Sequence, residues 1–126
     1  MIQVSLQAVW HVHSGERQKE FDQVLVTLLA DLAASGKVTH AAAAAGISER
    51  HAHKLITQWG EFLGAPLVVM KQGVGTRLTP LGTAILDAGG NVQARLGSEF
   101  DRLAADFAGS LNAAQGLLSA RLTGAE

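Results

Sequence analysis

Gly46 lies between two short segments of helical character, and this arrangement limits the fold of the chain more than any other feature. Thr39 is a good N-cap for the first segment, residues 40–45, which ends in five consecutive alanines. Alanine favours helix because it loses no side-chain entropy there, and its small side chain lets a second helix pack closely. Ser48 is a good N-cap for the second segment, residues 49–62. The sequence therefore predicts two helices joined by a tight glycine turn.

The two faces of the second predicted helix differ in chemistry. Apolar residues recur on one face at intervals of three and four: Ala52, Leu55, Ile56 and Trp59. The other face is polar and partly basic near the N-terminus: Glu49, Arg50, His53 and Lys54. A helix that enters the major groove of DNA, which is about 12 Å wide, needs such a face and a supporting helix before it. The predicted helix-turn-helix over residues 39–62 therefore points to binding of duplex DNA.

Each polar side chain on this face suits a particular contact with DNA. Arg50 can donate two hydrogen bonds to a guanine edge, and His53 can reach a base or a phosphate. Lys54 suits a phosphate, and Ser48 suits another together with the first free backbone amides of the helix. Glu49 can accept from a cytosine amine, or it simply favours the helix N-terminus. The alternative interpretation is an ordinary solvated face.

A β-hairpin is predicted over residues 67–79, where a short apolar run, a glycine-bearing turn and a second short strand follow one another. Lys71 lies near its tip and Arg77 near its base, and Thr76 can add a phosphate contact. A hairpin beside a recognition helix forms a wing that can lie over the DNA backbone or the minor groove. These three residues, and Thr39 on the supporting helix, therefore join the candidate DNA contacts.

The chain begins with a clear alternation of apolar and polar residues, the apolar ones being Ile2, Val4, Leu6, Ala8 and Trp10. Period two is typical of a half-buried strand, which we predict over residues 2–12. A lone strand is not stable, so we expect it to pair with the hairpin at residues 67–79. His11 and His13 would share a face of this strand, but no acid or further ligand lies nearby, so we expect no metal site. A core-facing helix is predicted over residues 16–34 from its apolar stripe.

A long helix is predicted over residues 80–111, with Thr79 at its N-cap. It carries a long, narrow apolar stripe: Leu81, Ile85, Val92, Leu96, Phe100, Leu103 and Phe107. The preceding small domain is too short to cover this stripe, so a helix from a second copy is the simplest cover and these residues are candidate homodimer contacts. Gly89 favours a kink, and the small polar tail over residues 112–126 is expected to be flexible.

Composition excludes several classes of protein. The chain has 126 residues, a net charge of −1 and no cysteine, which excludes disulfide scaffolds and thiol-based zinc sites and suits the cytoplasm. It has no apolar run long enough for a membrane span and no signal-peptide pattern. Residues 36–80 contain five basic and two acidic residues, a local charge of +3. No nucleophile motif or paired carboxylates appear, so we expect neither an enzyme nor a bound cofactor.

The segment from Ser35 to Leu86 resembles the winged helix-turn-helix head of LysR-type regulators, and still more that of ModE-type molybdate regulators. The matching pieces are Ala42-Ala43, Gly46-Ile47-Ser48, Ile56, Leu63-Gly64-Ala65-Pro66-Leu67 and Leu78-Thr79-Pro80-Leu81-Gly82. The predicted N-terminal strand favours the ModE type, because LysR heads usually begin directly with the first helix. The resemblance covers residues 2–106 and implies an α+β, mostly α fold, with the winged domain in residues 1–79 and a dimerisation helix after it.

The chain departs from the LysR pattern at two places. LysR proteins usually carry Leu-Glu where this chain has Trp59-Gly60, and Phe and Arg in the wing where it has Val68 and Met70. The chain also stops before any effector domain. In the ModE family oxyanion binding resides in C-terminal domains, so molybdate sensing does not transfer to these residues. We expect either a longer protein with an effector domain or a head that stands alone.

The sequence thus predicts a transcriptional regulator that binds duplex DNA as a homodimer, with one recognition helix in the major groove of each half of a pseudo-palindromic operator. The alternative is a protein-interaction module, in which the winged fold and the long helix mediate assembly without DNA.

Overall fold

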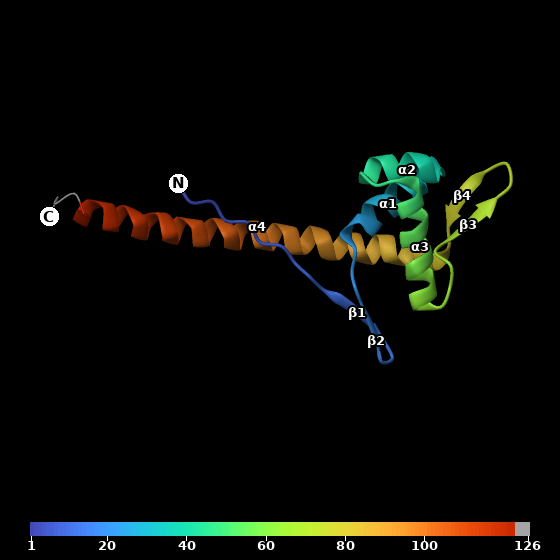
Figure 1. Ribbon diagram of the computed structural model, residues 1–126, viewed down its shortest axis with the longest axis horizontal. Helices are drawn as coiled ribbons and strands as arrows, with labels where there is room; N and C mark the ends of the chain where they lie inside the picture. Colours follow the sequence, from blue (N-terminus) through green and yellow to red (C-terminus); the bar gives the residue numbers. More distant parts are fainter. Residues whose placement is uncertain (123–126) are drawn as a thin grey trace. The chain divides into compact units, whose positions relative to one another are not determined.

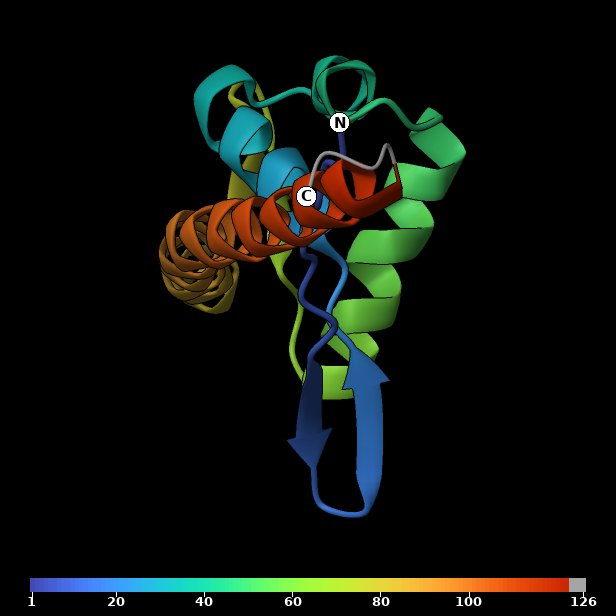
Figure 2. The same ribbon diagram turned by 90° about the vertical axis from the view of Figure 1, so that its left-hand side faces the viewer.

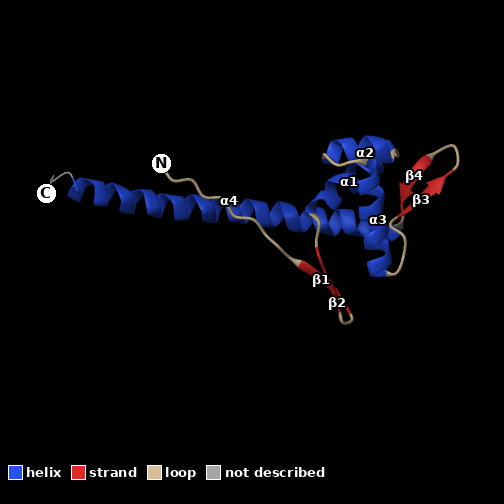
Figure 3. Ribbon diagram, in the orientation of Figure 1, coloured by secondary structure: helices blue, strands red, loops and turns tan. Residues whose placement is uncertain are grey.

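The computed structural model describes residues 1–122, with side chains described for residues 1–119. Helices predominate over two small antiparallel sheets, which confirms the predicted α+β, mostly α class (Figures 1 and 3). The elements in chain order are β1 (His11–Ser14), β2 (Arg17–Glu20), α1 (Gln23–Ser35), α2 (Val38–Ala45), α3 (Glu49–Leu63), β3 (Val68–Lys71), β4 (Gly75–Leu78) and α4 (Pro80–Leu122). The chain divides into two compact units, residues 9–93 and residues 1–8 with 94–126.

The core of the unit formed by residues 9–93 is built around α1. The apolar stripe of this helix is fully or almost fully buried: Leu25, Val26, Leu28, Leu29 and Leu32. Ala41 and Ala42 of α2 pack on it at 0% and 1% exposure, so the alanine run does provide a surface for close helix packing. Trp59 of α3 and Leu67 complete the centre of the core.

The predicted helix-turn-helix is present. Gly46 ends α2 with a φ of 72°, and its backbone N–H donates to the carbonyls of Ala42 and Ala43. That left-handed conformation favours glycine, because a Cβ would be strained there. Figures 1 and 2 show that the axes of α2 and α3 cross steeply. The N-terminus of α3 is therefore presented beside α2 at one end of the unit.

The wing is also present, and it is anchored to the helices by its backbone. β3 and β4 pair antiparallel, with Val69 opposite Arg77. The N–H of Thr76 donates to the carbonyl of Gly36 at 2.9 Å, at the junction of α1 and α2. Gly75 has a φ of +102°, and a Cβ there would lie 2.7 Å from the same Gly36 oxygen. The wing thus approaches the helices too closely for any side chain at this position.

The N-terminal strand predicted over residues 2–12 is wrong in extent and in partner. Only His11–Ser14 forms a strand, and it pairs with β2 through a two-residue turn containing Gly15 at a φ of 63°, not with the wing. The helix predicted from residue 16 begins at Gln23 instead. Residues 16–20 carry no apolar side chain, so they have nothing to bury as part of a helix, and they form β2 and its turn.

Residues 1–8 are extended and lie on the later part of α4, within the second unit. The N–H of Ile2 donates to Oδ1 of Asn112 at 2.9 Å, and Nδ2 of Asn112 donates to the carbonyl of Ile2 at 3.1 Å. Alternate residues, such as Ile2 and Val4, are half-buried while Gln3 is exposed. The period-two alternation therefore reports one-sided burial only in part, because Leu6 is 44% exposed, and the covering surface is a helix rather than a second strand.

Helix α4 runs further than predicted. It passes through Gly89 without interruption. Gly89 is buried against Phe21 and Val26, so closely that an added Cβ would lie 3.0 Å from the ring of Phe21 and 3.1 Å from Val26. This glycine allows close packing rather than a break. Residues 112–122, predicted as part of a flexible tail, are helical, and residues 123–126 of that tail lie outside the described residues.

Candidate DNA-binding surface

The N-terminal half of α3 presents an exposed polar face. Oγ of Ser48 accepts a hydrogen bond from the N–H of His51 at 3.0 Å, which confirms Ser48 as the N-cap. Four predicted contact residues on this helix are exposed: Glu49, Arg50, His53 and Lys54. A shallow groove of about 430 Å³ runs along the same face, lined by Ser48, Arg50, His51, Lys54 and Gln58. The fold therefore brings the predicted contacts of the second helix together on one accessible surface.

The charges on this face are arranged unequally. Nε2 of His53 lies 3.7 Å from Oε1 of Glu49, one helical turn away, so the acid faces the histidine. Within residues 1–122, no ion pair involves Arg50 or Lys54. These two cations are therefore the groups on α3 best placed to meet an anion outside the molecule.

Helix α2 carries a side-chain cluster that sequence patterns did not reveal. Nδ1 of His40 lies 2.7 Å from Oδ1 of Asp31, and Oγ of Ser35 donates to the same oxygen at 3.0 Å. The hydrogen bond with His40 is the main cause that holds the pKa of Asp31 below its ordinary value of 3.8, although burial acts in the opposite direction. Asp31 and His40 are nine residues apart on different helices, so no helical spacing links them. The cluster fastens the start of α2 to α1.

Thr39 is exposed, but it is not the N-cap that the sequence predicted. Lys37 occupies that position, without a side-chain cap hydrogen bond, and α2 begins at Val38. Thr39 therefore lies in the first turn of α2 as an exposed residue.

Two of the three predicted wing contacts are accessible. Lys71 at the end of β3 and Arg77 in β4 are both exposed. Thr76 is buried at 4% exposure, and its hydroxyl lies 3.8 Å from the sulfur of Met70. The structure therefore contradicts a phosphate contact through Thr76, because the hairpin turns this side chain inward while its backbone joins Gly36. Met70, which stands where LysR wings usually carry Arg, is 76% exposed.

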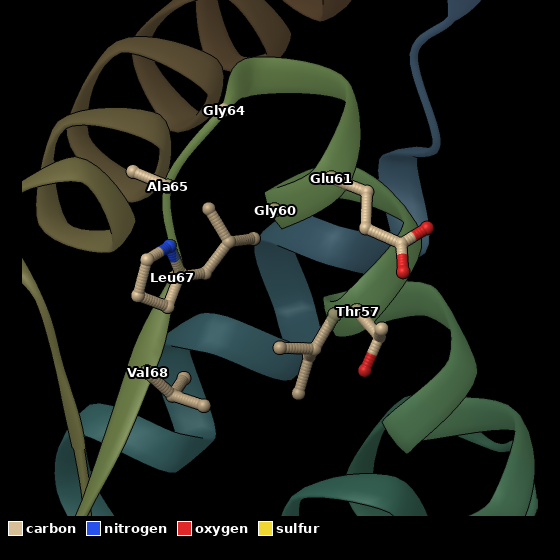
Figure 4. Close-up of a pocket in the computed structure, with 9 residues that line it drawn as sticks. Thr57, Gly60, Glu61, Gly64, Ala65, Leu67 and Val68 are labelled. Carbon is tan, nitrogen blue, oxygen red and sulfur yellow. The ribbon is translucent and has the colours of Figure 1, made fainter.

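A second groove of about 550 Å³ lies further along α3, between its later half and the segment that leads to β3 (Figure 4). Its lining is largely apolar and includes Ile56, Gly60, Pro66 and Leu67, with Thr57 and Glu61 at the edge. A Cβ on Gly60 would lie 3.1 Å from the carbonyl oxygen of Ala65. Glycine at this position thus lets the chain turn back closely beside α3.

No protein-family model matches the chain, and no curated protein matches it. Among solved structures it is similar to the CbnR_DBD-DNA complex, with 21% identity and a TM-score of 0.58 over 68% of this chain and 98% of that one. It is also similar to Vibrio fischeri DarR in complex with DNA, with 17% identity and a TM-score of 0.58 over 69% of this chain and 29% of that one. A third similar structure is VV2_1132, a LysR family transcriptional regulator, with 17% identity and a TM-score of 0.52 over 60% of this chain and 26% of that one. The chain has the winged helix-turn-helix fold of these structures.

The matched region explains one departure from the usual LysR pattern. Trp59, in place of the usual Leu, is 1% exposed and donates from Nε1 to Oδ2 of Asp22 at 2.9 Å. Glycine stands at position 60 because the chain at Ala65 passes so close to α3 that a side chain would be crowded there. The Trp-Gly pair of this winged helix-turn-helix therefore has a local structural reason. The chain spans only 29% and 26% of the length of DarR and VV2_1132.

The predicted dimer residues fall into two groups. Leu81 and Ile85 are half-buried against the core of their own winged domain, so they are occupied within the chain. Val92, Leu96 and Phe100 are also half-buried. Leu103 and Phe107, one turn apart on α4, are 46% and 56% exposed. The later part of the stripe is therefore the part that is open to a partner.

Across residues 1–122, no three His, Cys, Asp or Glu side chains lie close enough together to hold a metal ion. No described helix combines the length and the apolar character that crossing a membrane requires.

Proposed function

We propose that this chain is the DNA-binding part of a transcriptional regulator. The observation that carries the proposal is the exposed N-terminal half of α3, with Arg50 and Lys54 beside a helix start capped by Ser48. A helix N-terminus attracts anions through its free amides and its dipole, and the two cations add charge at the same place. Two proteins with the same fold, CbnR_DBD and DarR, are in complex with DNA, which supports this assignment.

In the proposed complex the N-terminal half of α3 lies in the major groove. Arg50 donates to a guanine edge, and Lys54 binds a phosphate. Glu49 and His53 complete this face, while Ser48 and the first amides of α3 meet another phosphate. Outside α3, further phosphate contacts come from exposed residues of α2 and the wing: Thr39, Lys71 and Arg77. The local charge of +3 over residues 36–80 favours DNA although the whole chain has a charge of −1.

We further propose that the chain acts as a homodimer on a pseudo-palindromic site. Leu96, Phe100, Leu103 and Phe107 recur at intervals of three and four on α4, which suits a seam between two helices. Two recognition helices would then read half-sites about 34 Å apart, one turn of DNA.

The relation to ModE-type regulators also belongs to the proposal. The extra β1–β2 hairpin before α1 supports a ModE-like head, since LysR heads usually begin with the first helix. DarR and VV2_1132 extend well beyond the region that this chain matches, which supports a longer protein with an effector domain. Such a regulator would work in the cytoplasm, together with its DNA.

Binding of labelled duplexes at low salt, measured by fluorescence anisotropy, tests the proposal. The wild-type protein should bind, and binding should weaken as salt rises. R50A should lose preference for a selected site by about 10-fold, whereas K54A should weaken binding to all duplexes and lower the salt slope by about 1. R95A, which removes a positive charge from an exposed position on α4, is the control and should bind normally. A wild-type protein that binds no duplex at low salt would rule out the DNA-binding role.

One observation favours a second candidate function, a protein-interaction module. Large apolar side chains are exposed on the wing, with Met70 at 76% and Val74 at 50%. If the anisotropy measurement detects no DNA binding while the protein still self-associates, this second function becomes the better account.

A further inference from the structure

The β1–β2 hairpin lies at the C-terminal end of α3, the opposite end from the polar face (Figures 1 and 2). Nη2 of Arg17 donates to the carbonyl of Phe62 at 2.7 Å, in the last turn of α3. The same guanidinium lies 5.1 Å from the centre of the Phe62 ring. Two different interactions thus join one hairpin side chain to the end of the recognition helix.

A second hairpin side chain adds to this contact. Nζ of Lys19 lies 5.3 Å from the centre of the Trp59 ring, three residues before Phe62 on the same face of α3. A cation over an aromatic ring is attracted by the negative charge on the ring face. The two cations of β2 therefore contact aromatic rings on two consecutive turns of α3.

The end of α3 lacks a cation of its own. Its last turn contains no basic residue, although a positive charge there would stabilise the helix dipole and satisfy a free carbonyl. Gly64, the C-cap, donates to the carbonyl of Gly60 and leaves that of Phe62 available. Arg17 supplies both the charge and the hydrogen bond from outside the helix.

A small change in the tilt of α3 at its C-terminal end causes a large displacement of the side chains at its N-terminal end. Arg50 and Phe62 are twelve residues apart, a distance of about 18 Å along a helix. A tilt of about 10° at the C-terminal end would therefore move the side chains at the N-terminal end by about 3 Å. Side chains that read base edges must be held within about 0.5 Å and 10–20° of their productive geometry.

We infer that the β1–β2 hairpin sets the orientation of the recognition helix, with Arg17 as the positioning residue. The inference rests on the proposed function, because it assigns to Arg17 a role in site discrimination without contact with DNA. In place of a basic residue within the last turn of α3, the hairpin supplies the contacts of Arg17 with Phe62, which we call the clamp. Loss of the clamp should weaken the reading of bases more than the binding of phosphates.

The experiment compares two duplexes, one selected from a random pool by the wild-type protein and one of scrambled sequence. R17A should lower affinity for the selected duplex about 10-fold, the scale of one lost charge-assisted hydrogen bond, and affinity for the scrambled duplex less than about 2-fold. R17K keeps the charge and a donor and should restore much of the discrimination. All variants are compared at a temperature where circular dichroism shows them to be folded.

Two control variants separate this role from simpler effects. R95A removes the same charge from an exposed position on α4, and Q18A removes an exposed side chain from the same strand. Both should leave the ratio of the two affinities unchanged. If R17A behaves like R95A, or if R17K discriminates no better than R17A, the inference is overturned.

A measurement without DNA distinguishes failure of the clamp from failure of the proposed function. Amide hydrogen exchange in the last turn of α3 should accelerate in R17A and recover in R17K, relative to the first turn of the same helix. Unchanged exchange there would overturn the clamp even if the wild type binds DNA. Accelerated exchange in a protein that binds no duplex would retain the clamp and reject only the DNA-binding role. If R17A does not fold, R17K and Q18A carry the comparison.

Discussion

Nε1 of Trp59 donates a hydrogen bond to Oδ2 of Asp22 at 2.9 Å, which joins the later half of α3 to the residue that precedes α1. Asp22 stands at the N-cap of α1, yet its side chain makes no cap hydrogen bond. Its carboxylate instead meets the indole of a residue that is 1% exposed. Helix α3 is therefore joined to α1 by a polar contact beside the ring of Phe21, which packs edge-on against Trp59.

This bond gives a first prediction. D22A leaves the buried indole N–H without its partner and should lower the free energy of unfolding by about 1–3 kcal/mol. D22N keeps an acceptor and should cost less than about 1 kcal/mol. Urea denaturation measures both. A double-mutant cycle with W59F provides the control: once the donor is gone, D22A should cost much less, and simple additivity would contradict the bond.

The second prediction concerns Gly82, at the start of α4. A Cβ at this position would lie 2.2 Å from the carbonyl oxygen of Leu67, a backbone atom that itself accepts from the N–H of Thr79. G82A should therefore destabilise the domain by about 3 kcal/mol, despite the roughly 1 kcal/mol that alanine gains in helix propensity. G90A is the matched control, because the nearest atom lies 3.7 Å away. It should leave the thermal midpoint unchanged or raise it; equal losses in both variants would contradict the packing.

The third prediction follows from the cluster on α2. The hydrogen bond with His40 lowers the pKa of Asp31 in the folded state below its ordinary value of 3.8. The ionised carboxylate thus stabilises the fold above that ordinary pKa, and this contribution disappears as pH falls through the lower folded value. The urea midpoint of the wild type should drop more steeply from about pH 5 to about pH 3 than that of D31N. Parallel pH profiles would show that the cluster adds no stability.

Local patterns were sufficient to predict the centre of the candidate site. The glycine turn at Gly46, the cap at Ser48 and the polar face of α3 all depend on residues close together in the chain, so capping and periodicity were enough to find them. Thr76 shows where such patterns stop. Its inward orientation depends on the contact between the wing and Gly36, forty residues earlier in the chain, and nothing in the hairpin sequence reports that contact.

The N-terminal region shows the same limit in another form. Period-two alternation in residues 2–8 indicates burial on one side, which holds for Ile2, Val4 and Ala8 but not for Leu6, which is 44% exposed. It does not say whether the covering surface is a strand or a helix. Asn112 provides the answer by pairing its side-chain amide with the backbone of Ile2. The β1–β2 hairpin had one visible signal, Ser14-Gly15 followed by a charged run without apolar residues. The role of Arg17 at the end of α3 had none, since it is purely tertiary.

The last prediction addresses the proposed homodimer. Phe107 is 56% exposed on the same stripe of α4 as Leu103. F107E would place a charge at the exposed end of the proposed apolar seam, so sedimentation at tens of micromolar should shift from dimer to monomer, while helix content by circular dichroism stays unchanged. S98E provides the control, because Ser98 is exposed and lies about 200° around the helix from Leu96. It should sediment as the wild type. A wild-type protein that is monomeric at this concentration would remove the reason for placing the seam on α4, and the two half-sites of the operator would then need another explanation.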